Sequence, residues 1–171
     1  MRVLLDTCVL YPPLMRNLLL GLAVRGLFAP LWSVEIAAEW LHLTARRGDA
    51  AGAEQPLLRM RASFPQGEVA GGDPATLNLP DASDRHVLAA AIAGGADLIL
   101  TANLRDFPRR ALAPHGLQAQ APDDFLMAQW LSAPEAVEAE VADLWPGLDG
   151  RDLRRALRKA GLPRLGKALA V

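Results

Sequence analysis

The chain begins with Met1-Arg2-Val3-Leu4-Leu5-Asp6-Thr7-Cys8, a stretch in which an apolar run ends abruptly in a carboxylate and a hydroxyl. A short apolar run bounded by polar residues is typical of a buried strand. Asp6 then lies at the carboxyl end of that strand, which is where open α/β sheets bind their ligands. Burying an unpaired carboxylate is costly. We therefore interpret Asp6 as the partner of a cation, and not merely as a cap for the turn that follows.

The rest of the chain alternates strands with helices. Further strands are predicted at residues 27–32, 97–103 and 117–120, with a short one around Val69, and Pro30 weakens the first of these or places it at a sheet edge. Helices are predicted at residues 14–24, 34–47, 50–64, 84–93, 122–131 and 134–144. Alternating strands and helices favour parallel pairing with right-handed crossovers. The sequence therefore predicts an α/β fold in which all strand carboxyl ends meet at one edge.

Composition limits the class of protein. A chain of 171 residues with 51% hydrophobic and 22% charged residues is one domain by the usual expectation. A net charge of −1 gives no overall basic field. The single cysteine, Cys8, excludes an internal disulfide, and we interpret it as a small buried apolar residue rather than a nucleophile. With no apolar stretch of about 20 residues, we expect a cytoplasmic protein without a membrane segment.

Acidic residues recur at the predicted strand ends. Asp81 and Asp84 stand at a helix start, Asp106 comes just after the strand that ends in Thr101, and Glu39 lies about a turn into the helix that follows the second strand. Carboxylates gathered in one crevice repel each other, and a divalent cation relieves that repulsion. Oxygen ligands without a His or Cys cluster suit Mg²⁺ or Mn²⁺. The chemistry that such a site indicates is hydrolysis of a phosphodiester.

Each acid also has a simpler interpretation on its own. Asp81 or Asp84 is a common helix N-cap, Glu39 alone fits a solvated helix face, and Asp106 alone fits a turn. It is their coincidence at one predicted edge that favours a metal site. His86, two residues after Asp84, could act as a general base, support the acids or contact RNA, but an incidental surface residue is the favoured interpretation, and it is not included in the catalytic set.

Four segments together carry a family resemblance. They are Val3-Leu4-Leu5-Asp6-Thr7, then Ser33 with Glu39, then Leu79-Pro80-Asp81-Ala82-Ser83-Asp84-Arg85-His86-Val87-Leu88-Ala89-Ala90-Ala91, then Leu98-Ile99-Leu100-Thr101-Ala102-Asn103-Leu104-Arg105-Asp106-Phe107. In this combination and spacing the chain resembles the PIN domain family, and most closely its bacterial branch related to VapC-type toxin ribonucleases. The resemblance covers roughly residues 1–125.

The resemblance implies a Rossmann-like, three-layer fold with a central parallel sheet flanked by helices. It implies a Mg²⁺- or Mn²⁺-dependent endoribonuclease, the toxin of a toxin–antitoxin pair, with an RNA substrate, an antitoxin protein as partner and a homodimeric state. The implied catalytic and metal-binding quartet is Asp6, Glu39, Asp84 and Asp106, with Thr7 and Thr101 orienting the ligands. Asn103, where some family members carry an acid, and Asp81 are possible further metal ligands.

The sequence divides into a PIN-like nuclease domain at residues 1–125 and a helical extension at residues 126–171, which we expect to pack on the same domain. Residues 151–171 contain seven basic residues against Asp152 alone, a net charge of +6, so residues 1–150 carry −7. These basic residues are Arg151, Arg154, Arg155, Arg158, Lys159, Arg164 and Lys167. The stripe either holds RNA phosphates or, slightly favoured, is a solvated face over Leu153, Leu157 and Leu162.

Other functions remain open at this point. A non-catalytic PIN-like scaffold that binds RNA or a partner protein is the main alternative, because Asn103 would weaken a metal site. A phosphoacceptor receiver domain also gathers acids at strand ends, but the only lysines, Lys159 and Lys167, stand in the basic tail. A nucleotide-binding Rossmann domain is disfavoured, because Asp6-Thr7-Cys8 stands where a glycine-rich loop is needed.

Overall fold

A parallel sheet lies at the centre of the protein. The computed structural model describes residues 1–48 and 51–170, and within them five strands pair in the order β3-β2-β1-β4-β5, every pair parallel. The strands are β1 (Arg2–Leu5), β2 (Ala29–Ser33), β3 (Glu68–Val69), β4 (Leu98–Leu100) and β5 (Gln118–Gln120). Val3, Leu4 and Leu5 are fully buried, as a central strand covered on both faces requires. The predicted α/β fold with a parallel sheet is confirmed.

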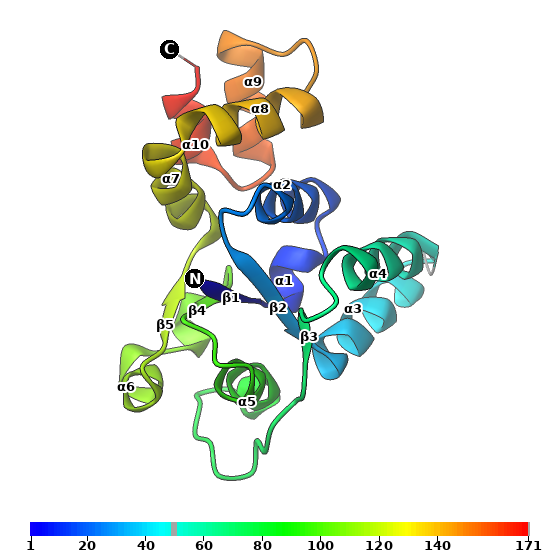
Figure 1. Cartoon of the computed structure of the whole chain (residues 1–171), viewed down its shortest axis with the longest axis vertical. Helices are drawn as coiled ribbons and strands as arrows, with labels where there is room; N and C mark the ends of the chain where they lie inside the picture. Colours follow the sequence, from blue (N-terminus) through cyan, green and yellow to red (C-terminus); the bar gives the residue numbers. More distant parts are fainter. Residues whose placement is uncertain (49–50, 171) are drawn as a thin grey trace.

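Helices cover both faces of this sheet. Figure 1 shows α2 on one side of the strands and α5 on the other, with α3 and α4 beside β3. The helices of the first part of the chain are α1 (Thr7–Leu10), α2 (Pro13–Val24), α3 (Val34–Arg46), α4 (Ala51–Ser63), α5 (Arg85–Ala93) and α6 (Arg109–Leu112), with single 3₁₀ turns η1 (Ala82–Asp84), η2 (Leu104–Asp106) and η3 (Ala113–His115). The predicted start of α4 at Ala50 lies outside the described residues. The predicted three-layer arrangement is likewise present.

The chain turns into a helix directly after the first strand. The backbone N–H groups of Val9 and Leu10 donate to the carbonyl of Asp6, so α1 begins one residue after the carboxylate. The Asp6 side chain makes no capping hydrogen bond to this helix. The interpretation of Asp6 as a simple cap is therefore excluded, and the short helix was not predicted because four residues give no periodicity to recognise.

Pro30 is tolerated within an interior strand. We predicted that it weakens this strand or marks a sheet edge, but β2 lies between β1 and β3. The Ala29 N–H donates to the carbonyl of Met1, just before β1, and the Trp32 N–H donates to Gly67 on the other side. The missing N–H of Pro30 therefore faces away from β1. β3 pairs only with Trp32 and Ser33. At Pro30 the strand is thus locally an edge, and no ladder bond is lost.

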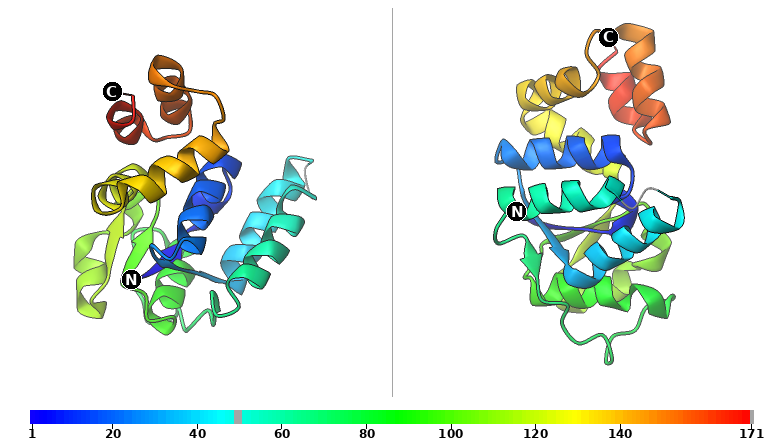
Figure 2. Two further views of the ribbon diagram at one scale, coloured as in Figure 1. Left: turned by 45° about the horizontal axis from the view of Figure 1, so that its top comes forward. Right: turned by 90° about the vertical axis from the view of Figure 1, so that its right-hand side faces the viewer.

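Four helices form the C-terminal part: α7 (Pro122–Ser132), α8 (Pro134–Leu144), α9 (Gly150–Lys159) and α10 (Pro163–Ala168). Figures 1 and 2 show them gathered at one end of the molecule, beyond α2. α8 packs on α2, and α10 packs on α7 and α9. Leu157, Leu162 and Leu165 are fully buried, whereas the basic side chains of α9 are exposed. The predicted division at residue 125 falls inside α7, and that division stays a prediction.

None of the helices in the described part of the chain is long and apolar enough to cross a membrane.

Candidate functional site

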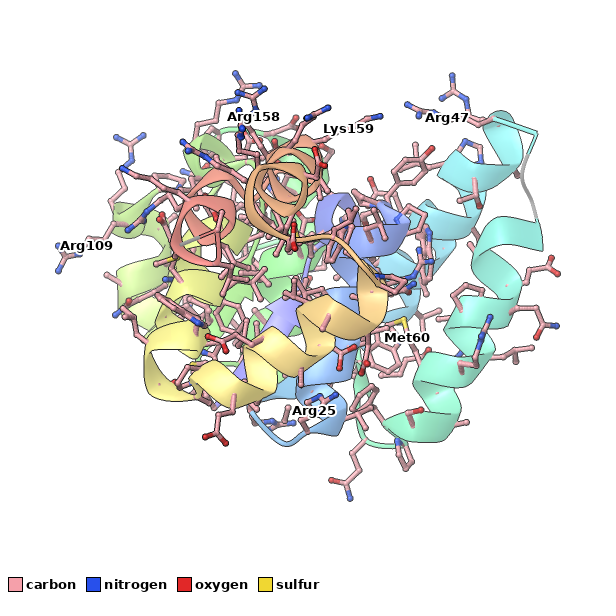
Figure 3. The ribbon with its side chains drawn as sticks, turned by 90° about the horizontal axis from the view of Figure 1, so that it is seen from above. Arg25, Arg47, Met60, Arg109, Arg158 and Lys159 are labelled. Carbon is pink, nitrogen blue, oxygen red and sulfur yellow. The ribbon has the colours of Figure 1, made fainter. Side chains whose placement is uncertain are left out.

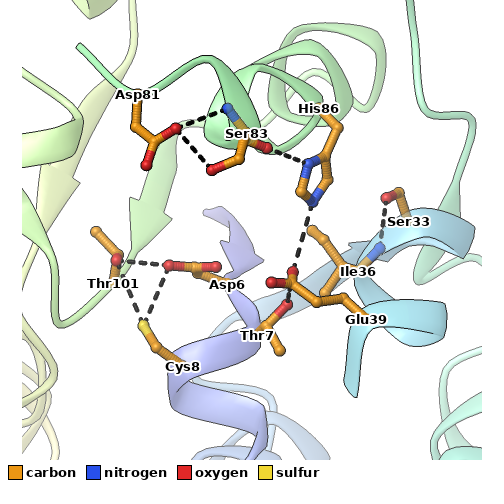
Figure 4. A network of polar contacts seen from close by, with 10 residues as sticks. All are labelled: Asp6, Thr7, Cys8, Ser33, Ile36, Glu39, Asp81, Ser83, His86 and Thr101. Atoms are coloured by element: carbon orange, nitrogen blue, oxygen red, sulfur yellow. Dashed lines mark hydrogen bonds and ion pairs between the residues drawn. The ribbon is translucent and has the colours of Figure 1, made fainter. Parts of the chain in front are cut away.

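The acidic residues lie where strands and helices meet at the carboxyl edge of the sheet. Asp6 follows β1, and Thr101 follows the neighbouring strand β4. Asp106 ends the 3₁₀ turn η2, and Asp84 ends the turn η1 just before α5. Glu39 lies in α3, a helix that Ser33 caps by accepting a hydrogen bond from the N–H of Ile36 at 3.2 Å. Figure 4 shows Asp6, Glu39, Asp81, Thr101 and the residues around them.

Asp6 is a buried carboxylate held by hydrogen bonds from β4 and α1. It is 7% exposed, and Thr101 Oγ1 donates to its Oδ2 at 2.6 Å. Cys8 Sγ donates to the same oxygen at 3.1 Å. The Asp6 N–H donates to the Leu100 carbonyl at 3.1 Å, which ties the backbone to β4. No described Lys, Arg or His forms an ion pair with Asp6, so its charge is left without a protein counterion.

Cys8 belongs to this polar network, which corrects our interpretation of it as an apolar filler. Its Sγ lies 3.4 Å from Thr101 Oγ1 and accepts a hydrogen bond from the Ala102 N–H at 3.2 Å. Burial, and then the charge of Asp6, raise the pKa of the Cys8 thiol to about 12. The group is a neutral donor to Asp6 at physiological pH, and it is not an activated nucleophile.

Glu39 is held from two directions although its side chain is 47% exposed. Thr7 Oγ1 donates to Glu39 Oε2 at 2.6 Å. His86 Nε2 lies 3.7 Å from the same oxygen, too far for a hydrogen bond but close enough for an ion pair when the imidazole is protonated. The ring is fixed by its Nδ1, which lies 2.8 Å from the Ser83 carbonyl oxygen. Glu39 is therefore oriented by α1 and by the start of α5 (Figure 4).

The pKa of Asp84 reflects the carboxylates around it. Partial burial, then the charges of Asp6, Asp106 and Asp81, raise its pKa to about 6, and His86 opposes the shift. A carboxyl whose pKa is raised by three other carboxyls lies in their common field. Three residues distant in sequence, Asp6, Asp84 and Asp106, are thus brought into one electrostatic neighbourhood. Among the side chains at residues 1–48 and 52–170, however, no three His, Cys, Asp or Glu stand as a ready-made metal-ligand group.

The remaining candidate metal ligands are more exposed than Asp6. Asp81 is exposed and caps η1: its Oδ1 accepts from the Ser83 N–H at 2.9 Å and from Ser83 Oγ at 2.8 Å. The backbone bond from Ser83, followed by the hydroxyl bond, lowers the pKa of Asp81. Asn103 is exposed, and its N–H donates to Thr101 Oγ1 at 3.0 Å. Asp106 is half-buried, with the exposed Arg105 guanidinium 3.7 Å away. The capping interpretation of Asp81 describes what its side chain does in this structure.

Two residues of the site were missed from the sequence. His86 was set aside as a surface residue, yet it is half-buried and faces Glu39. Cys8 was treated as apolar, yet it donates to Asp6. The position of His86 two residues after Asp84, at the start of a helix, was a signal that could have placed it near the acids. Nothing in the local sequence indicates the hydrogen bond of Cys8, because it depends on the packing of α1 against the end of β4.

This fold belongs to a recognised family of proteins. The model of the PIN domain family matches residues 2–105, more than half of the chain, and the protein is a member of that family. The chain is also similar to "Putative ribonuclease VapC50" of Mycobacterium tuberculosis, with 48% identity over 58 residues. That match covers 34% of this chain and 34% of the relative, so the aligned part spans about a third of that protein's length. No solved structure matches the chain significantly.

Proposed function

We propose that the protein is a metal-dependent endoribonuclease that hydrolyses RNA phosphodiester bonds, and that it is the toxin of a toxin–antitoxin pair. The observation that carries the proposal is the position of Asp6, Asp84 and Asp106 at the carboxyl edge of the sheet, where burial and the neighbouring carboxylates raise the pKa of Asp84. Membership of the PIN domain family and similarity to a protein whose name describes a ribonuclease support it.

The chemistry of the donors fits Mg²⁺ or Mn²⁺. The site offers carboxylate and hydroxyl oxygens, and Asp6 is buried without a counterion among the described residues. A divalent cation would be held by Asp6, Glu39, Asp84 and Asp106, and its charge would offset the repulsion that raises the pKa of Asp84. When bound, the cation supplies Lewis acidity and neutralises charge as water attacks a phosphodiester. Asp81 and Asn103 remain possible additional ligands at the exposed rim.

The other side chains of the site position the acids. Thr101 and Cys8 both donate to Oδ2 of Asp6, which restricts the orientation of the carboxylate. Thr7 does the same for Glu39. Donors that fix the orientation of ligating carboxylates reduce the entropy lost when a cation binds. His86 is near enough to Glu39 to compete for its charge when protonated, and it is therefore a modulator of the site in this proposal.

The test is cleavage of a fluorescent single-stranded RNA with Mn²⁺, with Mg²⁺ and with EDTA, by wild type and by Asp6→Asn. We expect cleavage that requires metal and falls by about two to three orders of magnitude in Asp6→Asn, since a metal contributes several kcal/mol to such transition states. Asp143→Asn is the matched control, because Asp143 is exposed on α8 and its carboxylate forms a surface ion pair with Arg25. Full activity in a folded Asp6→Asn protein would refute the proposal.

A non-catalytic scaffold is the second candidate. Asn103 is exposed at the rim where an acid would strengthen a metal site, and the described side chains form no ready-made ligand group. Calorimetric titration with Mn²⁺ separates the two. Binding that Asp6→Asn abolishes supports the nuclease, whereas folded wild type without Mn²⁺ binding supports the scaffold.

The partners follow from the same proposal. A toxin of this class would be neutralised by an antitoxin protein and would act on RNA in the cytoplasm, and we propose a homodimer in solution. Light scattering on the purified protein measures the oligomeric state directly, and a mass that equals one chain excludes the dimer.

A further inference from the structure

The C-terminal helices separate their charges by sign. α8 carries four acidic residues, Glu135, Glu138, Glu140 and Asp143, and no basic residue. α9 and α10 carry seven basic residues against Asp152. Only two of these seven are in ion pairs with described residues: Arg155 with Asp152, and Arg164 with Asp124. The acids of α8 therefore do not neutralise the basic helices, and the positive charge is directed to solvent.

The cations of α9 form a continuous face. Arg151, Arg154, Arg155 and Arg158 stand at helical positions i, i+3, i+4 and i+7, so their side chains share one side of the helix over about 10 Å of its axis. All four are exposed, while Leu157 on the opposite side is fully buried. These four arginines, with Pro163 and Lys167, line a shallow hollow of 340 Å³. We name the side chains of the four arginines the α9 basic face.

The α9 basic face lies on the same side of the molecule as the acidic edge. The right-hand view of Figure 2 places α9 on the side toward which the strands run from the N-terminus. Figure 3 shows Arg158 and Lys159 projecting at one margin and Arg25, at the end of α2, at the opposite one. A polyanion bound along α9 is therefore on the side of the strand carboxyl ends, where the acids lie.

The burial of Leu157, Leu162 and Leu165 explains the packing of α9 and α10 but not their charge. A helix surface that only has to be soluble can carry positive and negative side chains together, which also avoids repulsion between neighbouring charges. Arginines at helical spacing can bind consecutive phosphates. Three of the four, Arg151, Arg154 and Arg158, form no ion pair with a described residue, and Arg155 pairs only with the exposed Asp152. A face of guanidinium groups reads no base edges, so its contribution is independent of RNA sequence.

We infer that the α9 basic face binds the phosphate backbone of the RNA and holds the strand across the side of the molecule that carries the acidic edge. This inference rests on the proposed function for its choice of RNA, and it adds that the extension outside the matched family region contributes a substrate-binding surface. Affinity then comes largely from the extension, whereas hydrolysis belongs to the acids.

The test measures binding without cleavage. Fluorescence anisotropy of a fluorescein-labelled 20-nucleotide RNA, in EDTA, compares wild type with Arg154→Gln/Arg158→Gln across a salt series. We expect Kd to rise about tenfold near 0.1 M salt, and the slope of log K against log salt to decrease by about 1 to 2, since each lost phosphate contact removes about 0.7. Arg154→Lys/Arg158→Lys keeps the charge and is expected to bind within about threefold of wild type.

Arg2→Gln/Arg59→Gln is the matched control, because it removes the same charge from two exposed arginines, at the start of β1 and in α4, that like Arg154 and Arg158 form no ion pair with a described residue. Circular dichroism verifies that each variant is folded. Equal losses in the two Gln pairs, an unchanged salt slope in Arg154→Gln/Arg158→Gln, or wild type that binds no RNA would each overturn the inference. Metal-dependent cleavage with unchanged RNA binding in the α9 variant refutes this inference alone. RNA binding through α9 without cleavage in the presence of any metal would refute the proposed nuclease activity and would leave the proposed RNA-binding role of α9 supported.

Discussion

The acidic edge and the α9 basic face are both clusters of like charge, but they are built in opposite ways. Asp6 is 7% exposed and is held by Thr101 and Cys8. The arginines of α9 are exposed on a helix whose other side carries the buried Leu157. In a partly buried site, like charges increase the free energy that each group needs to stay ionised. Like charges in water are screened. We therefore expect substitutions at the acidic edge to change both stability and chemistry, and substitutions on the α9 basic face to change polyanion binding only.

The largest expected effect tests whether the extension and the sheet form one structure. Leu157→Ala removes a fully buried side chain beneath the basic face, and we expect it to lower the free energy of unfolding by about 2–5 kcal/mol. If α7–α10 unfold together with the sheet, thermal denaturation will show one transition shifted to lower temperature.

Leu131→Ala is the control, since Leu131 is 73% exposed, and its effect should stay within about 0.5 kcal/mol. Two separated transitions in Leu157→Ala, with only the lower one shifted, would instead define residues 126–171 as an independent unit.

The second effect concerns the orientation of Asp6. Thr101→Val removes the 2.6 Å hydrogen bond to Asp6 Oδ2 with little change in volume, and we expect metal affinity and RNA cleavage each to fall about 10- to 100-fold. Thr44→Val is the matched control: Thr44 is also buried, but its hydroxyl donates to carbonyls of its own helix, those of Trp40 and Leu41. Cleavage unchanged by Thr101→Val would show that the fold positions Asp6 without this bond.

The order of the elements and the position of Asp6 could be predicted from the sequence, whereas the contacts of the site could not. The order of strands and helices, and the strand-end position of Asp6, follow from apolar runs that stop at a polar residue, a pattern local enough to be recognised. The hydrogen bonds from Thr101 to Asp6 and from Thr7 to Glu39 join residues 95 and 32 positions apart, so their distances depend on how β4, α1 and α3 pack. Their existence could be proposed only through the family resemblance.

The remaining differences from the sequence analysis have the same origin. Pro30 was predicted to weaken its strand or to mark a sheet edge; β2 is interior to the sheet, but β3 is too short to pair with Pro30, so the edge exists only at this position. His86 was judged as one exposed residue on a helix, although the 3₁₀ turn before α5 directs its ring toward Glu39. In both cases the environment on one side of a single residue decides the outcome, and a linear pattern does not contain it.

A smaller effect is expected from relieving the repulsion at Asp84. Because the pKa of this carboxyl is raised from 3.8 to about 6 in the folded state, its stabilising contribution is present below about pH 4 and is lost as pH rises through 6. Asp84→Asn should therefore be more stable than wild type at pH 8, by about 1 kcal/mol after allowance for the partial exposure of the side chain, and equal to it near pH 4.

Thermal denaturation in EDTA measures this difference as about 2–4 °C in Tm. Addition of Mn²⁺ should reverse the order, because the cation stabilises wild type more than the variant. A variant that is less stable than wild type at pH 8 in EDTA would mean that Asp84 is not in a repulsive site.

The smallest expected effect concerns an exposed ion pair on the α9 basic face. Arg155→Gln breaks the ion pair between Arg155 and Asp152, whose side chains are 73% and 65% exposed, and we expect the free energy of unfolding to change by less than about 0.5 kcal/mol. Denaturation by urea at low salt and at 0.5 M salt measures this change in the free energy of unfolding, which should be no larger at 0.5 M, where the ion pair is screened. A larger loss would mean that the α9 basic face helps to hold the fold. A negligible loss would leave this arginine without a role in stability, as the proposed phosphate-binding role of the α9 basic face requires.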